Sequence, residues 1–211
     1  YPGLVLPIGG DMISGLIHDL PLGNEGTVLE QTLEAYGLLV WLIDQCLEHF
    51  PRIFIPCVYG NHGRITQQKN NIKAAVNNLD WMLYNLLEKH YKEEPRVRFL
   101  ITEGFDAYFC IYDVHTVLTH GDNSGARGSG GSLGAAMPIL RGAQKIKRQY
   151  TLDGKPVHLI LTAHLHTKLR PAEDVIANGS LVGLDEYAMS HRLDQQSPRQ
   201  SLIFIHPKWG V

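Results

Sequence analysis

The chain has 211 residues, of which 44% are hydrophobic and 19% are charged, and its formal net charge is −2. This length favours a single α/β domain spanning 1–211, and the slightly acidic balance argues against a protein whose whole surface attracts nucleic acid. No run approaches the roughly 18 uncharged apolar residues of a membrane helix, and Cys46, Cys57 and Cys110 lack metal-type spacing, so we expect a cytoplasmic protein with reduced core thiols and no membrane partner.

A first apolar strand is predicted at 4–8, and it ends at Gly9-Gly10-Asp11. An acidic residue just past a strand, beside glycines that let the backbone approach closely, occupies the place where open α/β sheets carry out chemistry. The chain starts inside this apolar pattern without a methionine, so we expect that the parent protein has residues before Tyr1.

Two helices and a second strand follow. Thr27 is the predicted cap of a helix that reaches about His49, and a second helix is predicted at about 70–92. Between them, the strand 52–58 ends in Tyr59-Gly60-Asn61-His62-Gly63-Arg64, which again places ligand-capable side chains at a strand end. Apolar residues that recur at helical spacing are expected in the core: Leu29, Leu33, Tyr36, Leu39, Val40 and Ile43, then Ala75, Leu79, Met82, Leu83, Leu86 and Leu87.

Short strands are predicted at 97–101, 107–112 and 114–119, and the last ends in His120-Gly121. The segment 123–134 contains five glycines and Arg127 but lacks the Gly-Lys-Ser/Thr of a phosphate-binding loop. We interpret it as a mobile loop beside the site, with a plain linker as the alternative. A helix at about 138–150 carries basic side chains that face either water or a phosphate backbone: Arg141, Lys145, Lys147 and Arg148.

The apolar run 159–162 leads into Ala163-His164-Leu165-His166. If the chain stays extended past Ala163, the two-residue period of a strand puts both histidines on one face, where imidazoles can bind Zn, Mn or Fe. A His-x-His pair alone is more often coincidence than a metal site, so its weight depends on the other strand ends. Further strands are predicted at 174–177, 181–183 and 201–206.

In order, Gly10-Asp11, Gly60-Asn61-His62, His120-Gly121 and Ala163-His164-Leu165-His166 resemble the motifs of the calcineurin-like metallophosphoesterases, over nearly the whole chain. The resemblance implies a four-layer β sandwich flanked by helices, here lacking its first strand, and two divalent metal ions. Manganese is favoured, with iron or zinc as alternatives, because mixed nitrogen and oxygen ligands suit these ions.

The resemblance also implies a role for each matched residue. Asp11 would bridge the two metals, Asn61, His120 and His164 would complete one site, and His166 would bind the other metal. His62 would be the catalytic residue that binds no metal and protonates the leaving oxygen or stabilises charge on the phosphoryl group. Two cations about 3.5–4 Å apart neutralise an anionic phosphodiester and lower the pKa of a bridging water, which explains why a shared carboxylate is needed.

Two departures from the family pattern affect these expectations. The opening Asp-x-His motif is absent from 1–11, so we expect it before Tyr1 and predict partial metal occupancy and little activity for the chain as given. Gly63-Arg64 stands where an acidic residue often follows the Asn-His pair, and Arg64 and Arg127 are candidates for contact with substrate phosphate. Asn-His-Gly-Arg, together with 178–180 and 185–187, resembles a branch found in phage and prophage genomes.

The expected function is hydrolysis of phosphate esters at a dinuclear metal centre, with a phosphodiester or nucleic acid favoured as substrate. A phosphodiesterase or phosphatase acting on a small nucleotide is the second enzyme hypothesis, and a shallow dependence of binding on salt would indicate it. A binding domain that has lost its metals is the third hypothesis. The missing first motif favours this reading, and the presence of every later ligand position argues against it. The sequence does not indicate an oligomeric state.

Overall fold

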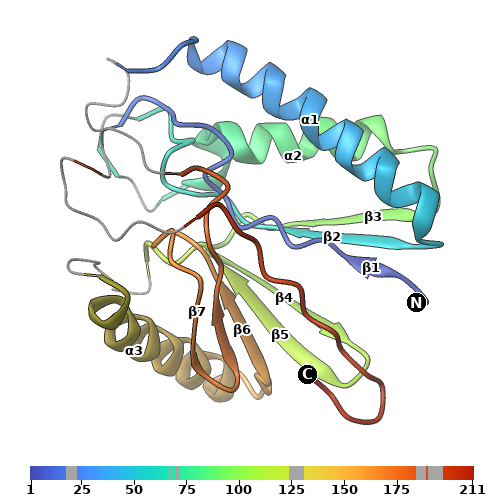
Figure 1. Cartoon of the computed structure of the whole chain (residues 1–211), viewed down its shortest axis with the longest axis vertical. Coiled ribbons are helices and arrows are strands. Elements are labelled where there is room, and N and C mark those ends of the chain that lie inside the picture. Colours follow the sequence, from blue (N-terminus) through green and yellow to red (C-terminus); the bar gives the residue numbers. More distant parts are fainter. Residues whose placement is uncertain (18–22, 67, 70–71, 124–130, 184–188, 190–196) are drawn as a thin grey trace. The chain divides into compact units, whose positions relative to one another are not determined.

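The computed structural model describes residues 1–17, 23–66, 68–69, 72–123, 131–183, 189 and 197–211, with the backbone alone for 131–135. Its described residues form a mixed α/β structure with three α-helices and two β-sheets. They divide into two compact units, unit 1 (Tyr1–Ala107) and unit 2 (Tyr108–Val211), each drawn in Figure 1. The expectation of a single domain stays a prediction.

Unit 1 is built on a three-stranded parallel sheet in the order β1-β2-β3, formed by Leu4–Val5, Ile53–Cys57 and Val97–Ile101. Helix α1 (Val28–His49) connects β1 to β2, and α2 (Leu79–His90) connects β2 to β3. Both helices lie on the same side of this sheet in Figure 1, as right-handed crossovers between neighbouring parallel strands require. The carboxyl ends of β1 and β2 therefore lie at one edge.

Helix α1 begins where the sequence predicts. The Thr27 hydroxyl accepts from the N–H of Glu30, and the Glu30 carboxylate accepts from the N–H of Thr27, which completes a capping box. The predicted core face is wrong at its start, because Leu29 and Leu33 are 63% and 68% exposed. The buried row runs instead through Thr32, Leu39 and Ile43, and Leu33 lies about 100° around the helix from Thr32.

Helix α2 starts later than predicted. A short 3-10 turn, η2 (Ala75–Asn77), precedes it, and the Asn78 side chain caps it by accepting from the N–H of Asp80. Its buried face consists of Asp80, Leu83, Tyr84 and Leu87. The prediction was wrong for Met82 and Leu86, which are 39% and 41% exposed because the inward face is turned toward the neighbouring positions 80 and 84.

Apart from the first two residues of β4, unit 2 contains a five-stranded sheet in the order β4-β5-β6-β8-β7. Its strands are β4 (Asp106–Ile111), β5 (Val114–Thr119), β6 (Leu159–Thr162), β7 (Leu169–Ala172) and β8 (Val175–Ala177). The pairs β5–β6 and β6–β8 are parallel, so the carboxyl ends of these three strands share an edge, whereas β7 runs antiparallel to β8. Strand β7 was not predicted separately.

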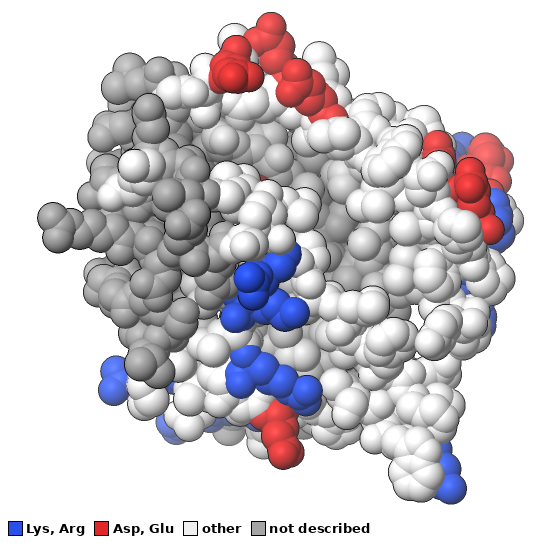
Figure 2. Space-filling view, viewed as in Figure 1, with Lys and Arg blue, Asp and Glu red and all other residues white. Residues whose placement is uncertain are grey.

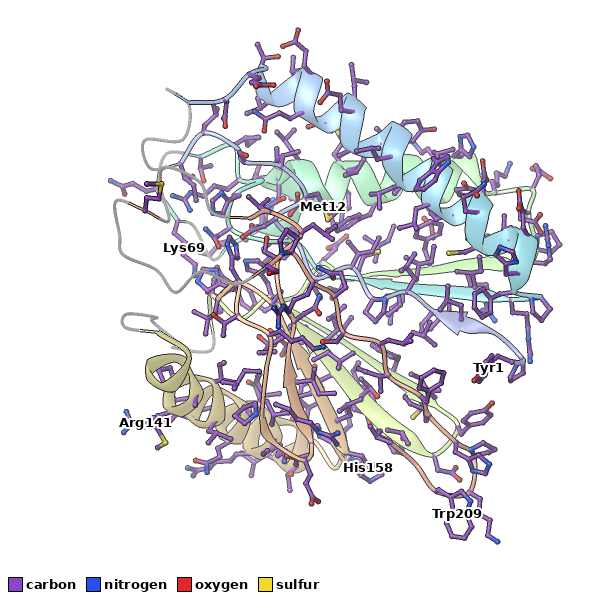
Figure 3. All side chains as sticks on the ribbon, viewed as in Figure 1. Tyr1, Met12, Lys69, Arg141, His158 and Trp209 are labelled. Carbon is purple, nitrogen blue, oxygen red and sulfur yellow. The ribbon has the colours of Figure 1, made fainter. Side chains whose placement is uncertain are left out.

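Helix α3 (Gly131–Leu152) covers one face of this sheet by packing Ile139, Ala143 and Ile146 against β5, β6 and β8. It begins seven residues before the predicted Pro138, which lies inside the helix. Residues 131–134 of the predicted mobile loop are therefore helical, whereas 124–130 lie outside the described residues. Figure 3 shows the side chain of Arg141 on the side of α3 that faces away from the sheet.

The opposite face of the second sheet is covered by the chain after β8. Ile203 and Ile205 pack against a cluster of Val114, Leu159 and Ile176. The strands predicted at 181–183 and 201–206 were wrong, because these stretches join neither sheet ladder and only an isolated bridge links His206 to Gly210. The cysteines are thiols, but the core prediction was wrong for Cys110, which is exposed.

Within the described ranges, no helix combines the length and the apolar character that crossing a membrane would demand.

Candidate functional site

Two loops at the edge of the unit 1 sheet carry the first group of candidate residues. Ile8 still pairs with Cys57 beyond β1, and the chain then turns through Gly10 and Asp11, whose φ angles are +86° and +56°. A Cβ on Gly10 would overlap the backbone of Tyr59 and Gly60. Glycine at position 10 therefore permits the close approach of the two loops, and Asp11 lies against Gly60.

The side chain of His62 is held by the loop that contains Asp11. The His62 N–H donates to Asp11 Oδ1 at 2.8 Å, and His62 Nδ1 lies 2.8 Å from the carbonyl oxygen of Ser14. A carbonyl oxygen can only accept, so Nδ1 carries the hydrogen and Nε2 is the nitrogen that gains or releases a proton. Nε2 lies 3.9 Å from Asp11 Oδ2. The contacts of the His62 N–H with Asp11 and of His62 Nδ1 with Ser14 therefore hold Asp11 and His62 next to each other within unit 1.

Asn61 and Arg64 lie in the same loop as His62. The Arg64 guanidinium donates to backbone carbonyl oxygens of its own loop, through Nη1 to Asn61 and through Nε to Thr66, each at 3.3 Å. These contacts stabilise the loop that positions Asn61. Contact of Arg64 with substrate phosphate stays a prediction, and Arg127 lies outside the described residues.

Asp80 is a residue that the sequence reasoning missed. Its side chain is fully buried at the start of α2, and it accepts hydrogen bonds from the backbone N–H groups of Asp11 and Gly60, both at 2.9 Å, and of Met12 at 3.2 Å. Met12 is labelled in Figure 3 in the loop after β1. A signal in the sequence that could have drawn attention to Asp80 is its position two residues after Asn78, a residue type that often caps helices.

The space beside Gly63 is occupied by side chains from the start of α2. A Cβ at Gly63 would collide with Asn78 Oδ1 and would lie 3.0 Å from the Asp80 carboxyl carbon. An acidic side chain at position 63 would therefore have no room, because α2 has already placed a carboxylate there.

The charge of Asp80 also has an effect on the buried Tyr84. Burial first, and then the charge of Asp80, raise the pKa of the Tyr84 phenol, whose hydroxyl donates to the Val58 carbonyl at 3.2 Å.

Two histidines come together in unit 2. His120 follows β5 and His164 follows β6, and their ring centroids lie 5.0 Å apart at an interplanar angle of 63°. His120 is only 2% exposed, and its carbonyl oxygen accepts from the N–H of Ala163 at 3.0 Å. Gly121 has φ of +115°, and a Cβ there would press on Thr162 and His164. The loop after β5 is thus fastened to the end of β6.

The expectation that His164 and His166 share one face of an extended strand is wrong. Strand β6 ends at Thr162, and the N–H of Leu165 donates to the carbonyl oxygen of Ala163 at 2.7 Å, which closes a tight turn. His164 and His166 both adopt left-handed φ angles, +66° and +52°. The turn places His164 beside His120 and leaves His166 exposed at its end.

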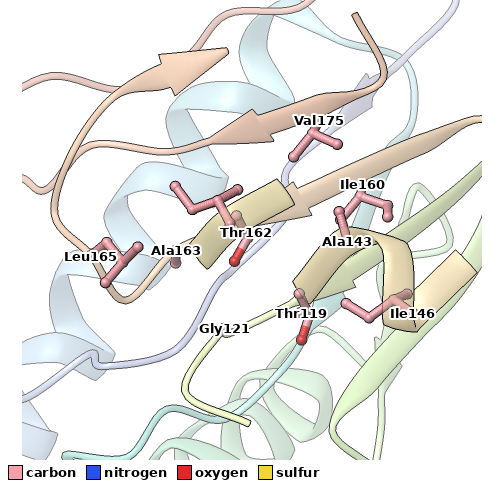
Figure 4. A pocket seen from close by; sticks show the side chains of 10 residues that line it. Thr119, Gly121, Ala143, Ile146, Ile160, Thr162, Ala163, Leu165 and Val175 are labelled. Carbon is pink, nitrogen blue, oxygen red and sulfur yellow. The ribbon is translucent and has the colours of Figure 1, made fainter. Parts of the chain in front are cut away.

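A small pocket lies between α3 and the ends of β5 and β6, and its lining includes Gly121 and Ala163, the sequence neighbours of His120 and His164 (Figure 4). Its walls are mainly apolar, with hydroxyls from Thr119 and Thr162. The Thr162 hydroxyl donates to the His120 carbonyl oxygen at 3.4 Å. We interpret the pocket as packing space between α3 and the sheet, because its described lining residues include no charged group that would recognise a phosphate.

Each unit contains side chains of types that can bind a metal ion. In unit 2 the imidazoles of His120 and His164 are adjacent, and in unit 1 Asp11 and Asn61 lie in the two loops that meet at one edge of the sheet. Imidazole nitrogens suit ions such as Zn and Fe, and carboxylate oxygens suit Mn. That the side chains of the two units bind metal at one centre stays a prediction from the sequence motifs.

Comparison of the chain with models of protein families, with curated proteins and with solved structures found no significant match.

Proposed function

We propose that the chain is a metal-dependent phosphoesterase, of the metallophosphoesterase type with its four-layer sandwich, acting on phosphodiesters. The observation that carries the proposal is the buried ring of His120 against His164, at the carboxyl ends of two adjacent parallel strands. Two imidazoles at one point offer a pair of nitrogen ligands. In unit 1, the loop that carries Asp11 is attached to His62, which supplies the acid that the reaction needs.

The proposed metal ligands are Asp11, Asn61, His120, His164 and His166, for two divalent ions with manganese favoured and iron or zinc as alternatives. When bound, such ions supply positive charge for the phosphodiester and a water of lowered pKa. Asp11 would be the carboxylate among these ligands. Asp11 lies in a left-handed turn, in which its own N–H and the N–H of Met12 donate to Asp80. These hydrogen bonds set the direction of the Asp11 carboxylate.

His62 is the proposed general acid. With Nδ1–H donated to the Ser14 carbonyl oxygen, a protonated ring has its second N–H at Nε2. The leaving oxygen would take the proton from Nε2 as its bond to phosphorus breaks. The Ser14 carbonyl thus performs the orienting role that a carboxylate next in sequence performs in related motifs, because it fixes which nitrogen transfers the proton.

The basic surface of α3 supports a nucleic-acid substrate. Arg141, Lys145 and Arg148 are exposed and recur at helical spacing, and the sequence of α3 contains no acidic residue. Figure 2 shows basic side chains in the region of α3. Lys147 differs, because it pairs with Asp174. Several cations along one face suit a chain of phosphates better than a single nucleotide, and binding that falls steeply with salt would distinguish the two.

The test measures Mn²⁺ binding by calorimetry together with hydrolysis of bis-p-nitrophenyl phosphate. The variant Asp11→Asn should weaken Mn²⁺ binding by at least about 10-fold and abolish the low hydrolysis expected of the chain as given, because an amide lacks the anionic oxygen that a carboxylate supplies to a cation. Asn tolerates left-handed φ angles, so the backbone at position 11 should be preserved. The matched control is Asp153→Asn, at an exposed position after α3. Equal Mn²⁺ affinity in Asp11→Asn and in the unchanged chain would refute the proposal.

A further inference from the structure

Asp80 connects two loops that are distant in sequence. Through Oδ2 it accepts from the N–H of Gly60 after β2 and from the N–H of Asp11 after β1, and through Oδ1 it accepts from Met12. The carboxylate itself belongs to α2 and is fully buried. A buried carboxylate requires several such donors, so its position and the positions of both loops depend on each other.

Asn78 strengthens the same connection. Its side-chain oxygen accepts from the N–H of Asp80, and its Nδ2 donates to the carbonyl oxygen of Gly60 at 2.7 Å. Gly60 is therefore held through both its N–H and its carbonyl group. Two further backbone hydrogen bonds fasten the loop to the start of α2: the N–H of Leu79 donates to the Gly63 carbonyl oxygen at 2.7 Å, and the N–H of Ile65 donates to the Asn77 carbonyl oxygen at 3.1 Å. Together these two bonds form the antiparallel bridge between Arg64 and Asn78.

The loop after β1 needs such a restraint. Asp11 has a left-handed φ of +56°, a conformation that non-glycine residues seldom adopt without help. The hydrogen bonds of Asp80 to two successive N–H groups, those of Asp11 and Met12, hold the chain in that conformation. The same turn aims the Asp11 carboxylate at the His62 N–H. Loss of the restraint would allow the carboxylate to move away from His62.

We propose that Asp80 is a positioning residue, which joins the loops after β1 and β2 through one carboxylate and so fixes Asp11 relative to Asn61 and His62. Its role in catalysis depends on the proposed phosphoesterase function, in which Asp11 and Asn61 are metal ligands and His62 is the acid. Asp80 touches neither metal nor substrate in this proposal. Its effect reaches the reaction through the backbone groups that it holds.

The test uses Asp80→Asn, which keeps the shape of the side chain. In either orientation of the amide, an NH2 group would face one or two backbone N–H donors that need an acceptor. The matched control is Leu83→Ala, because Leu83 is equally buried one turn later on α2 and belongs to the hydrophobic core of unit 1. Both variants are compared with the unchanged chain at a temperature at which circular dichroism shows all three to be folded.

Two measurements distinguish positioning from a general loss of stability. Amide hydrogen exchange, in metal-free protein, should be accelerated at least about 10-fold at Asp11, Met12 and Gly60 in Asp80→Asn, with little change along α1. In Leu83→Ala, protection should fall evenly across unit 1. Mn²⁺ affinity should fall about 10- to 100-fold in Asp80→Asn, as for other residues that orient metal ligands, and should stay unchanged in Leu83→Ala.

The outcomes separate the two proposals. Unchanged exchange at the three amides in Asp80→Asn, or the even pattern seen with Leu83→Ala, would overturn the role of Asp80. If the unchanged chain fails to bind Mn²⁺ while the three amides respond as expected, the phosphoesterase proposal fails and the loop restraint stands. If Asp80→Asn does not fold, Asp80→Glu is measured in the same way. In the unchanged chain, rapid exchange at Asp11 and Gly60 would by itself overturn the restraint.

Discussion

The Nδ1 atom of His62 lies 2.8 Å from the carbonyl oxygen of Ser14, so a main-chain group of one loop fixes the ring of a residue in another. The next residue, Gly15, has φ of +72°, and a Cβ there would collide with the carbonyl oxygen of His62. The close approach of the two loops therefore depends on a glycine. The acceptor does not depend on the Ser14 side chain, because it belongs to the backbone.

Gly15→Ala should therefore disturb His62. We expect turnover to fall about 10- to 100-fold, the size of effect that a misplacement of about 1 Å produces, while Mn²⁺ affinity changes little. The control is Ser14→Ala, which keeps the carbonyl acceptor at an exposed position. Steady-state kinetics and calorimetry on both variants provide the test. Equal turnover in Gly15→Ala and Ser14→Ala would contradict the assigned role of the Ser14 carbonyl.

His120→Ala and His164→Ala should each lower Mn²⁺ affinity by at least about 10-fold, because each removes one nitrogen of the pair. Loss of the buried His120 ring should also lower the melting temperature, since it leaves a cavity. His158→Ala is the control, at an exposed histidine beside β6. Calorimetric titration with Mn²⁺ is the measurement. An affinity loss in His158→Ala equal to that in His164→Ala would contradict the assignment.

Two of the three thiols, Cys57 and Cys110, should differ in their rates of alkylation. Burial raises the pKa of the Cys57 thiol, and Cys57 is inaccessible, so it should react with iodoacetamide only after unfolding. Cys110 is exposed and should react before Cys57. Partial loss of water around its thiol, and then the charge of Asp113, nevertheless raise the pKa of the Cys110 thiol as well. Its rate should therefore keep rising with pH above the ordinary thiol pKa. Mass spectrometry of the alkylated chain at several pH values tests this order, and modification of Cys57 in the folded chain would contradict it.

Thr27→Ala should lower the free energy of unfolding by about 1 kcal/mol, because it removes the side-chain cap of α1. Thr27→Ser keeps the hydroxyl and is the control.

Hydrogen bonds from the N–H and hydroxyl of Thr27 lower the pKa of Glu30. The stabilisation that involves ionised Glu30 is therefore complete above its unfolded pKa of about 4.3 and is lost as pH falls through the lower folded value. Urea unfolding at neutral and acidic pH measures both effects. Equal stability of the two variants would contradict the capping role.

The sequence allowed the strand-end positions to be predicted, because the rule behind them is local. Apolar runs bounded by glycines predicted that Asp11, His62, His120 and His164 would each follow a strand, and each does. Parallel pairing within each sheet then places His120 and His164 at the same edge. The turn at His164 was missed because alternation of small, polar and apolar residues is compatible with both an extended strand and a tight turn.

Asp80 was missed for a different reason. On a predicted helix an acidic residue normally faces water, and nothing near it in sequence indicates that backbone N–H groups from two distant loops will surround it. Leu29 and Leu33 show the reverse error, since helical spacing identifies a face but not whether another element covers it. Contacts between segments far apart in sequence decide both cases, and a local pattern does not contain them.

The glycine at position 63 has a consequence for how related sequences can vary. Because its missing side chain makes room for Asn78 and Asp80, the two locations compete for the same volume. A carboxylate can be supplied from the loop or from the helix, but not from both at once. Exchange of one arrangement for the other would require paired replacements, and either replacement made alone should be far more harmful than the two together.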